Sequence, residues 1–200
     1  MTDCGTARYF LGIRIDYNKK NGIMKLSQEA AATKMLDKFG LSNCNPTHTP
    51  MEKGLQLTHD GNRTSHPYRE LLGSIMYQML CVGPDLCYPV NYMGRYQQNP
   101  TESHWTSLKQ VTRYLKGTTT MALIIKKGES SILLEGYVDA DWAIDVEDRM
   151  SVTEFSFKVY GCSVLWARRK QATVSTSSSE AEYVALSAAV FVQVVDETDE

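Results

Sequence analysis

The chain has 200 residues, of which 42% are hydrophobic and 22% are charged, and its formal net charge is −2 at pH 7. This composition is typical of a soluble globular protein, and the length allows one large domain or two small ones. No apolar run approaches the ~20 residues that cross a bilayer, which argues against a membrane protein. The five cysteines are scattered and the N-terminus has no basic stretch followed by an apolar one. We therefore expect an intracellular protein, in the cytoplasm or nucleus, with reduced thiols and no secretory signal.

The charges are unevenly distributed along the chain. Residues 63–128 hold 8 Lys and Arg against 3 Asp and Glu, whereas residues 129–200 hold 5 against 14. A mildly basic middle and an acidic end indicate parts with different roles. The middle could contact phosphate groups, but a solvated helix face also explains so small an excess.

The N-terminal third predicts a β-hairpin followed by a helix. Residues 8–17 alternate between two sides, residues 18–22 are rich in turn formers, and an apolar run returns at 23–26. These features predict two paired strands. Ser27 is a good helix cap, apolar residues then recur at helical spacing, and Gly40 ends the pattern. Residues 41–66 are rich in Asn, Pro, Thr, His and Gly and predict a long connection.

Three more helices are predicted in the middle of the chain, over residues 67–82, 84–96 and 101–117. Pro89 falls inside the second of these patterns. An interior proline destabilises a helix by about 3 kcal/mol, so we expect a kink or a late start there. On the third helix Lys109, Arg113 and Lys116 recur at i, i+4 and i+7. This stripe could follow a nucleic-acid backbone, although a solvated face is the commoner meaning.

Strands are predicted over residues 121–125, 132–142, 155–160 and 163–167, with a turn at residues 126–130. On the second of these strands Asp139 and Asp141 lie two residues apart and therefore point to the same face. Clustered carboxylates are the ligands that a divalent cation prefers. The alternative is a solvated strand end that runs into the polar segment at residues 145–149.

A second candidate carboxylate lies on a helix predicted to start near Glu180. Ser179 and Glu182 match the capping box S-x-x-E, which is a structural explanation for Glu182. The helical spacing also groups Glu182 with the small and apolar residues Ala185, Leu186 and Ala189. If that group packs on the sheet, Glu182 lies at the sheet-facing edge and Glu180 is solvated. An acid on a strand and an acid on a helix packed against it form part of two-metal phosphodiesterase sites.

Several motifs occur in one order along residues 1–190. They are RYFLGIRI, LSQEAAATKML, YRELLGSIMYQML, HWTSLKQVTRYLKGT, YVDADWA and VSTSSSEAEYVAL. Together they resemble the Pol polyprotein of copia-type LTR retrotransposons. The resemblance implies an α+β fold: a β-hairpin and a helical thumb- and connection-like region, followed by an incomplete RNase H-like mixed β-sheet with one packed helix. It implies a reverse-transcriptase C-terminal part over residues 1–120 and a truncated RNase H-like domain over residues 121–200.

The resemblance also implies roles for two acids. Asp139 and Glu182 match the strand aspartate and helix glutamate that bind the catalytic metals in this family. Two further acidic ligands would be expected, and no D-N motif surrounds Asp196. The paired polymerase aspartates are absent. Glu154 stands where the family has a glycine, which suggests a lost tight turn. We expect half a ligand set to give at most a weak Mg²⁺ site and no other cofactor.

Three functions remain open at this stage. The first is a catalytically inactive Pol-derived fragment that retains some binding of an RNA–DNA hybrid or duplex. The second is an active metal-dependent ribonuclease H, completed by a partner or a second copy. The third is a protein-interaction module recruited by a host, with an unknown partner. No membrane or small-molecule substrate is expected. The candidate nucleic-acid-binding residues are Lys109, Arg113, Lys116, Arg168, Arg169 and Lys170.

Overall fold

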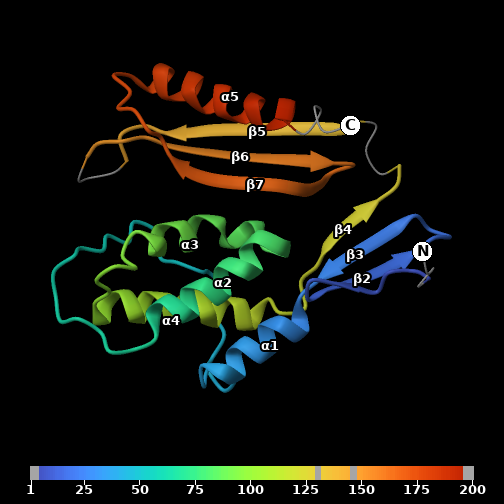
Figure 1. The fold of residues 1–200 in the computed structure, drawn as a ribbon, viewed down its shortest axis with the longest axis horizontal. Helices are drawn as coiled ribbons and strands as arrows, with labels where there is room; N and C mark the ends of the chain where they lie inside the picture. The colour runs from blue at the N-terminus through green and yellow to red at the C-terminus, as the bar shows by residue number, and fades with distance from the viewer. Residues whose placement is uncertain (1–4, 129–131, 145–147, 196–200) are drawn as a thin grey trace. The chain divides into compact units, whose positions relative to one another are not determined.

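The computed structural model describes residues 5–128, 132–144 and 148–195 (Figure 1). The predicted turn at 126–130, the polar segment at 145–149 and Asp196 therefore lie partly or wholly outside the described residues. The chain divides into two compact units, residues 1–125 and residues 126–200. Within the described residues, no helix combines the length and the apolarity needed to cross a membrane.

The first unit carries a four-stranded sheet in the order β1-β2-β3-β4, with bounds Tyr9–Phe10, Ile13–Asn18, Ile23–Ser27 and Leu123–Lys126. The predicted single strand over residues 8–17 is wrong, because a two-residue turn divides it. Leu11 and Gly12 both have positive φ, at 46° and 75°. That backbone is what a tight hairpin of right-handed twist requires.

Strand β4 belongs to this N-terminal sheet, next to β3. Its sequence had been expected to open the C-terminal region at residue 121. The boundary between the two compact units instead falls after Ile125. Hairpin and β4 therefore form one sheet, although almost a hundred residues of helix and loop separate them in the sequence.

Four helices follow the hairpin, close to the predicted ranges. Their bounds are Glu29–Lys38 for α1, Tyr68–Val82 for α2, Cys87–Gly94 for α3 and Glu102–Gly117 for α4. The late start expected at Pro89 is confirmed, since a 3-10 turn, η1, occupies Pro84–Leu86 and the α-helix begins at Cys87. Pro89 thus lies in the first turn of α3, where its missing N–H breaks no helical hydrogen bond.

The helices enclose a continuous apolar core, to which each contributes the side chains of one face. Its buried members are Met35, Leu36, Tyr68, Leu71, Leu72, Ile75, Met79, Leu86, Val90, Met93, Trp105, Leu108, Val111 and Leu115. The long connection is held to this core by tyrosine hydroxyls. Tyr92 donates to the Leu55 carbonyl and accepts from the Leu57 amide, each at 3.2 Å. Tyr96 donates to the Leu57 carbonyl at 2.9 Å.

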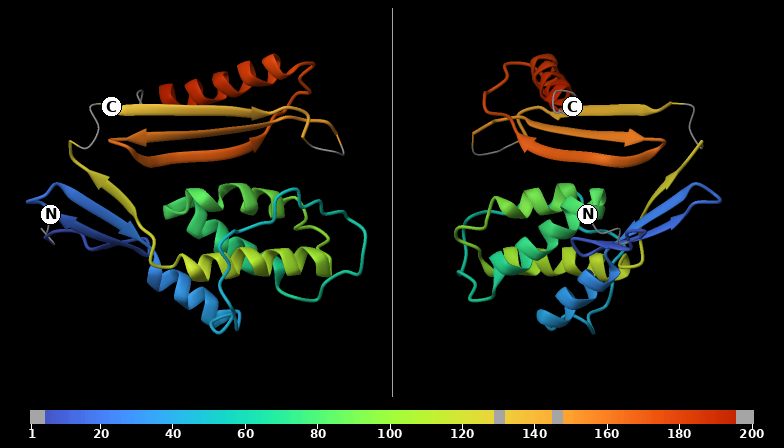
Figure 2. Two further views of the ribbon diagram at one scale, coloured as in Figure 1. Left: turned by 180° about the vertical axis from the view of Figure 1, so that it is seen from behind. Right: turned by 45° about the vertical axis from the view of Figure 1, so that its right-hand side comes forward.

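The second unit is a three-stranded sheet covered by one helix. Strands β5, Leu134–Asp141, β6, Val152–Val159, and β7, Cys162–Lys170, are antiparallel neighbours in that order. The predicted mixed sheet is thus wrong for the described residues, whose strand pairs are all antiparallel. Helix α5, Ser178–Val195, lies along one face of this sheet, as both views of Figure 2 show.

Candidate functional site

The strand register decides which side chains of the second sheet meet α5. Val138, Phe155 and Ala167 are cross-strand partners and pack with Ala189 of α5. Since side chains alternate along a strand, their neighbours Asp139, Glu154 and Arg168 point to the opposite face. These three are also direct cross-strand partners. The candidate acids of β5 therefore lie on the face that α5 does not cover.

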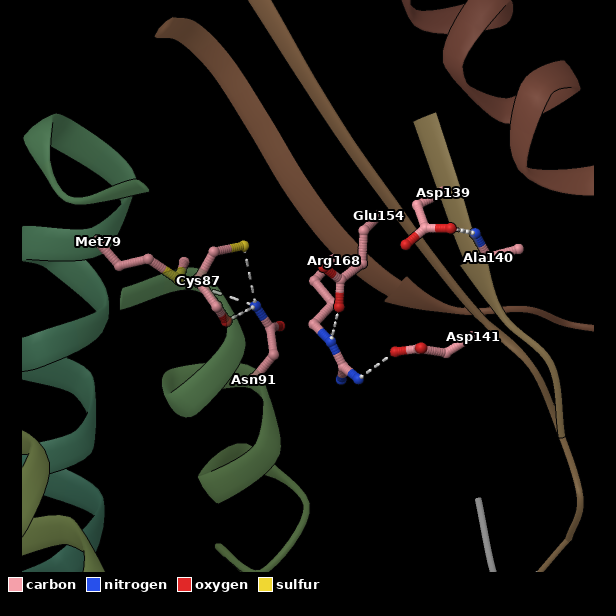
Figure 3. A network of polar contacts seen from close by, with 8 residues as sticks. All are labelled: Met79, Cys87, Asn91, Asp139, Ala140, Asp141, Glu154 and Arg168. Atoms are coloured by element: carbon pink, nitrogen blue, oxygen red, sulfur yellow. Dashed lines mark hydrogen bonds and ion pairs between the residues drawn. The ribbon is translucent and has the colours of Figure 1, made fainter. Parts of the chain in front are cut away.

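Arg168 occupies the centre of this polar face. Its side chain is only 7% exposed, its Nε donates to Glu154 Oε1, and its Nη2 lies 3.5 Å from Asp141 Oδ2 (Figure 3). A buried guanidinium needs compensating charge, and the two carboxylates provide it. Asp141, predicted as a possible metal ligand or a solvated residue, instead pairs with an arginine.

Asp139 remains exposed beside this cluster. Its Oδ1 accepts a hydrogen bond from the Ala140 amide at 2.9 Å (Figure 3). Asp139 lies directly opposite Glu154 in the β5–β6 pair. Two like charges in facing positions repel each other. The guanidinium of Arg168 bonds Glu154 and so offsets that repulsion.

Glu154 had been interpreted as a replaced turn glycine, and this interpretation is wrong for the described structure. Glu154 lies inside β6, paired with Asp139 on one side and with Arg168 on the other. Glu154, for which the resemblance implied a glycine, is thus a residue that bonds the buried arginine.

At the start of α5 the capping glutamate is Glu180, and not Glu182 as expected. The helix begins at Ser178, and the Ser177 hydroxyl accepts from the Glu180 amide at 3.2 Å. The Glu180 carboxylate accepts from the amide of Thr176 at 2.6 Å and from its hydroxyl at 2.7 Å. These bonds to Thr176 lower the pKa of Glu180. Ser177 and Glu180 therefore form the capping pair, and Glu182 is not needed for it.

The inward face of α5 is formed by three alanines. Ala181, Ala185 and Ala189 are at most 1% exposed, whereas Leu186 is 51% exposed. Ala185 and Ala189 pack inward, as predicted. Leu186 was also predicted to pack inward, and this was wrong, because the buried stripe starts one residue earlier, at Ala181. Glu182 lies beside Ala181 and is exposed. Its position on the helix is therefore at the flank of the packed face.

The structure does not assemble the two predicted metal ligands into one cluster. Asp139 points to the face of the sheet opposite α5, and Glu182 lies on α5. Among the described residues, no group of three or more His, Cys, Asp or Glu side chains could hold a metal ion. Two-metal hydrolysis needs several carboxylates around both ions, and the residues described do not fit that requirement.

Two of the three predicted basic residues of α4 hold the long connection in place. Arg113 Nε donates to the Asn45 carbonyl and Lys116 Nζ donates to the Cys44 carbonyl, each at 2.6 Å. Lys109 is half-buried on the same helix. The stripe predicted to contact phosphates therefore contributes at least two of its cations to intramolecular bonds.

The three predicted basic residues of β7 differ in their surroundings. Arg168 is buried in the ion pairs described above, and Lys170 Nζ lies 2.5 Å from Asp148 Oδ2. Arg169 is exposed at the end of the strand. Of this group, Arg169 is the cation whose exposure best suits contact with an external phosphate.

The chain has relatives among the proteins of transposons. It is 36% identical to the retrovirus-related Pol polyprotein from transposon TNT 1-94 of Nicotiana tabacum, over 92% of this chain and 14% of that protein. It is 35% identical to an uncharacterized mitochondrial protein of Arabidopsis thaliana, over 93% of this chain and 77% of that protein. It is 44% identical to secreted RxLR effector protein 161 of Plasmopara viticola, over 62% of this chain and 86% of that protein.

These similarities define the class to which the protein belongs. The chain belongs to the family of copia-type, retrovirus-related Pol polyproteins of transposons. It spans 14% of the length of the TNT 1-94 polyprotein and 12% of the length of the RE2 polyprotein of Arabidopsis thaliana. No family model matches the chain, and no solved structure does.

Proposed function

We propose that this protein is a Pol-derived fragment from the reverse transcriptase and RNase H region that does not cleave RNA–DNA hybrids. The observation that carries the proposal is the buried guanidinium of Arg168, bonded to Glu154 and Asp141. A permanent cation on this face thus holds Glu154 and Asp141 in ion pairs, beside Asp139.

The energetics of that pair support the proposal. Releasing Asp141 or Glu154 to a metal would break one of the two ion pairs of a buried arginine. Breaking a buried pair destabilises a protein by roughly 3–5 kcal/mol. The partly exposed carboxylates reduce this penalty, because water can screen them. The guanidinium would also repel a divalent cation placed beside Asp139. Each effect weakens metal binding at the ancestral position.

The proposal includes a weak affinity for RNA–DNA hybrids. Arg113 and Lys116 bond loop carbonyls and Arg168 is buried, so Lys109 and Arg169 are the predicted cations best suited to phosphates. If about two phosphates are contacted, the logarithm of affinity falls with the logarithm of salt with a slope near −2. Fluorescence anisotropy of a labelled hybrid at several salt concentrations measures that slope.

A cleavage assay tests the catalytic part of the proposal. The protein is incubated with an RNA–DNA hybrid in Mg²⁺ and in Mn²⁺, next to the Asp139→Asn variant. We expect no cleavage of the RNA strand above background with either protein. Metal-dependent cleavage by the wild type that Asp139→Asn abolishes would establish an active ribonuclease H instead, completed by acids from elsewhere.

A second candidate function is a protein-interaction module. The outer face of α5 carries large apolar side chains in contact with solvent: Tyr183, Leu186, Val190 and Phe191, which are 75%, 51%, 49% and 73% exposed. Such a face is typical of a surface that binds another protein. Protein binding that does not depend on salt and that Leu186→Ser removes would favour the interaction module. The protein should then also show no binding of an RNA–DNA hybrid at low salt.

A further inference from the structure

A polar cavity in the first unit lies where the long connection meets the start of α2. Its volume is about 270 Å³, close to the lower end of the range of roughly 300–1,000 Å³ that small-molecule sites occupy. Its lining residues include two arginines, one histidine and one carboxylate: Arg63, Arg69, His66 and Glu70. The cations considered above for nucleic-acid binding are at other positions, so this cavity is a separate candidate site.

The first turn of α2 adds two free donors to the lining. Pro67 precedes the helix and provides no side-chain cap, and the Leu71 amide bonds the Pro67 carbonyl at 3.1 Å. Among the described residues, the amides of Arg69 and Glu70 have no hydrogen-bond partner, and both residues line the cavity. Unpaired amides at the positive end of a helix dipole favour an anion.

A buried hydroxyl is an independent indication of an acceptor in the cavity. Thr64 lines it and is only 8% exposed. The Thr64 amide donates to the Pro100 carbonyl at 2.9 Å, and its hydroxyl oxygen accepts from the His66 amide at 3.2 Å. The hydroxyl can also donate one hydrogen bond, and no acceptor for it occurs among the described residues. Because buried donors are rarely left unpaired, a ligand oxygen at this position would complete the hydroxyl's bonds.

The two arginines supply the charge. Arg63 is exposed, and within the part of the chain that the structure describes its guanidinium makes no ion pair or hydrogen bond. Arg69 donates from Nε to the Gln97 carbonyl at 2.6 Å and from Nη2 to the Gln98 carbonyl at 3.3 Å. These bonds hold the Arg69 side chain beside the cavity. Since carbonyl groups are neutral, they leave its positive charge uncompensated.

The acids near the cavity have cations of their own. Glu70 Oε2 lies 3.6 Å from Lys38 Nζ. Glu102 Oε2 lies 4.0 Å from His66 Nε2, and the His66 ring stacks on Trp105 with 4.6 Å between the ring centroids. The lining therefore holds two arginines against one carboxylate, and that carboxylate is paired with a lysine.

We propose that this cavity binds the phosphate group of a phosphorylated ligand. A phosphate offers enough oxygens for the two free amides, the Thr64 hydroxyl and the planar guanidinium of Arg63 at once. A carboxylate, with two oxygens, would leave some of these donors unpaired. The phosphate can belong to a small phosphomonoester or to a nucleic-acid backbone, which share this group. The site lies in the first unit and does not depend on the proposed loss of catalysis in the second.

Titration of the wild-type protein with inorganic phosphate, followed by NMR of its backbone amides, tests the proposal. KCl keeps the ionic strength constant. The amide signals of Arg69 and Glu70 should shift and saturate as phosphate is added. A short RNA–DNA hybrid without terminal phosphates is titrated in parallel, and the tighter of the two probes identifies the source of the phosphate. If neither probe produces saturable shifts at these two amides, the proposal is overturned.

Arg63→Gln separates a local contact from the general effect of charge. Arg63 has no partner among the described residues, so the variant should keep its Tm within about 1–2 °C of the wild type. It should weaken phosphate binding by roughly 10-fold or more, because a charge-assisted hydrogen bond is lost. Arg8→Gln, at another exposed arginine of the same unit, is the matched control and should leave the affinity nearly unchanged. An equal loss in both variants would overturn the proposal.

Discussion

The two units of this protein bury different kinds of residue. The helical unit encloses fourteen buried apolar side chains in one cluster. Among the residues that the structure describes in the second unit, the corresponding cluster holds three, Phe155, Phe157 and Ala189. The first unit therefore derives its stability from an apolar core, whereas the second must depend more on its polar interior.

That polar interior is well satisfied. Gln171 Nε2 donates to the Thr153 hydroxyl at 3.1 Å and to the Ala181 carbonyl at 2.9 Å, and its Oε1 accepts from Ser175 at 3.1 Å. These bonds link β6, β7 and the start of α5. Buried networks of this kind specify geometry strongly but add only about 0.5–1.5 kcal/mol of stability per bond. The second unit is thus ordered by specific bonds more than by apolar burial.

Hydrogen exchange measures the contrast along the whole chain. The apolar core of the first unit should protect the amides of α2 and α4 far better than the sheet protects those of β5 and β7, which are edge strands in the described order. We expect that only the amides of α2 and α4 require complete unfolding of their unit before they exchange. Equally slow exchange in both units would remove the contrast.

Leu108→Ala should cause the largest change in stability. Leu108 is fully buried in the helical core, and truncating such a leucine destabilises by about 2–5 kcal/mol. Urea unfolding followed by circular dichroism measures the change. Leu80 on α2, which is 64% exposed, provides the control, because Leu80→Ala should change stability by less than about 0.5 kcal/mol.

Arg168→Gln should cause an intermediate loss of stability, confined to the second unit. It removes the cation from Glu154 and Asp141 and brings Asp139 and Glu154 into uncompensated repulsion. We expect a loss of about 1–3 kcal/mol, since both carboxylates are partly exposed. The exposed neighbour, in Arg169→Gln, should leave stability nearly unchanged. An equal effect of the two variants would refute the structural role of Arg168.

Acidification should weaken the helical unit by a smaller amount. His104 is fully buried, and its Nδ1 accepts from the Thr101 amide at 2.9 Å in a capping box. Burial, with His59 as a second cause, lowers the pKa of His104. The unfolded chain therefore binds this proton first, so the contribution is complete above the unfolded pKa near 6.5 and decreases as pH falls below it. The urea midpoint should decrease when the pH is lowered from 7.5 to 5.5. His104→Gln, which keeps a cap acceptor, should lack the part of this decrease that protonation of His104 causes.

The helices could be predicted from the sequence because their apolar residues repeat every three or four positions, and burial follows that repeat. The turn at Leu11 could not, since a leucine at positive φ contradicts its own preference and its position depends on pairing between β1 and β2. The strand β4 was assigned to the wrong sheet because nothing in its own sequence specifies a partner as distant as β3.

The ion pair of Arg168 was missed for a similar reason. Counting outward from the turn at Tyr160 and Gly161 places Glu154 opposite Ala167. An irregularity between Phe157 and Lys158 shifts the register by one residue and places it opposite Arg168. A one-residue shift moves every later side chain to the other face. Arg168 and its partners Glu154 and Asp141 were therefore visible in the sequence, but their pairing was not.

Binding of Mn²⁺ measures whether Arg168 replaces a metal on the polar face of the second sheet. Electron paramagnetic resonance would count free Mn²⁺ during titration of the wild type and of Asp139→Asn. If Arg168 replaces the metal, binding should be weak, should not saturate and should be the same for both proteins. A saturable site in the wild type that disappears in Asp139→Asn would show that Asp139 still holds a metal, and would contradict its replacement by Arg168.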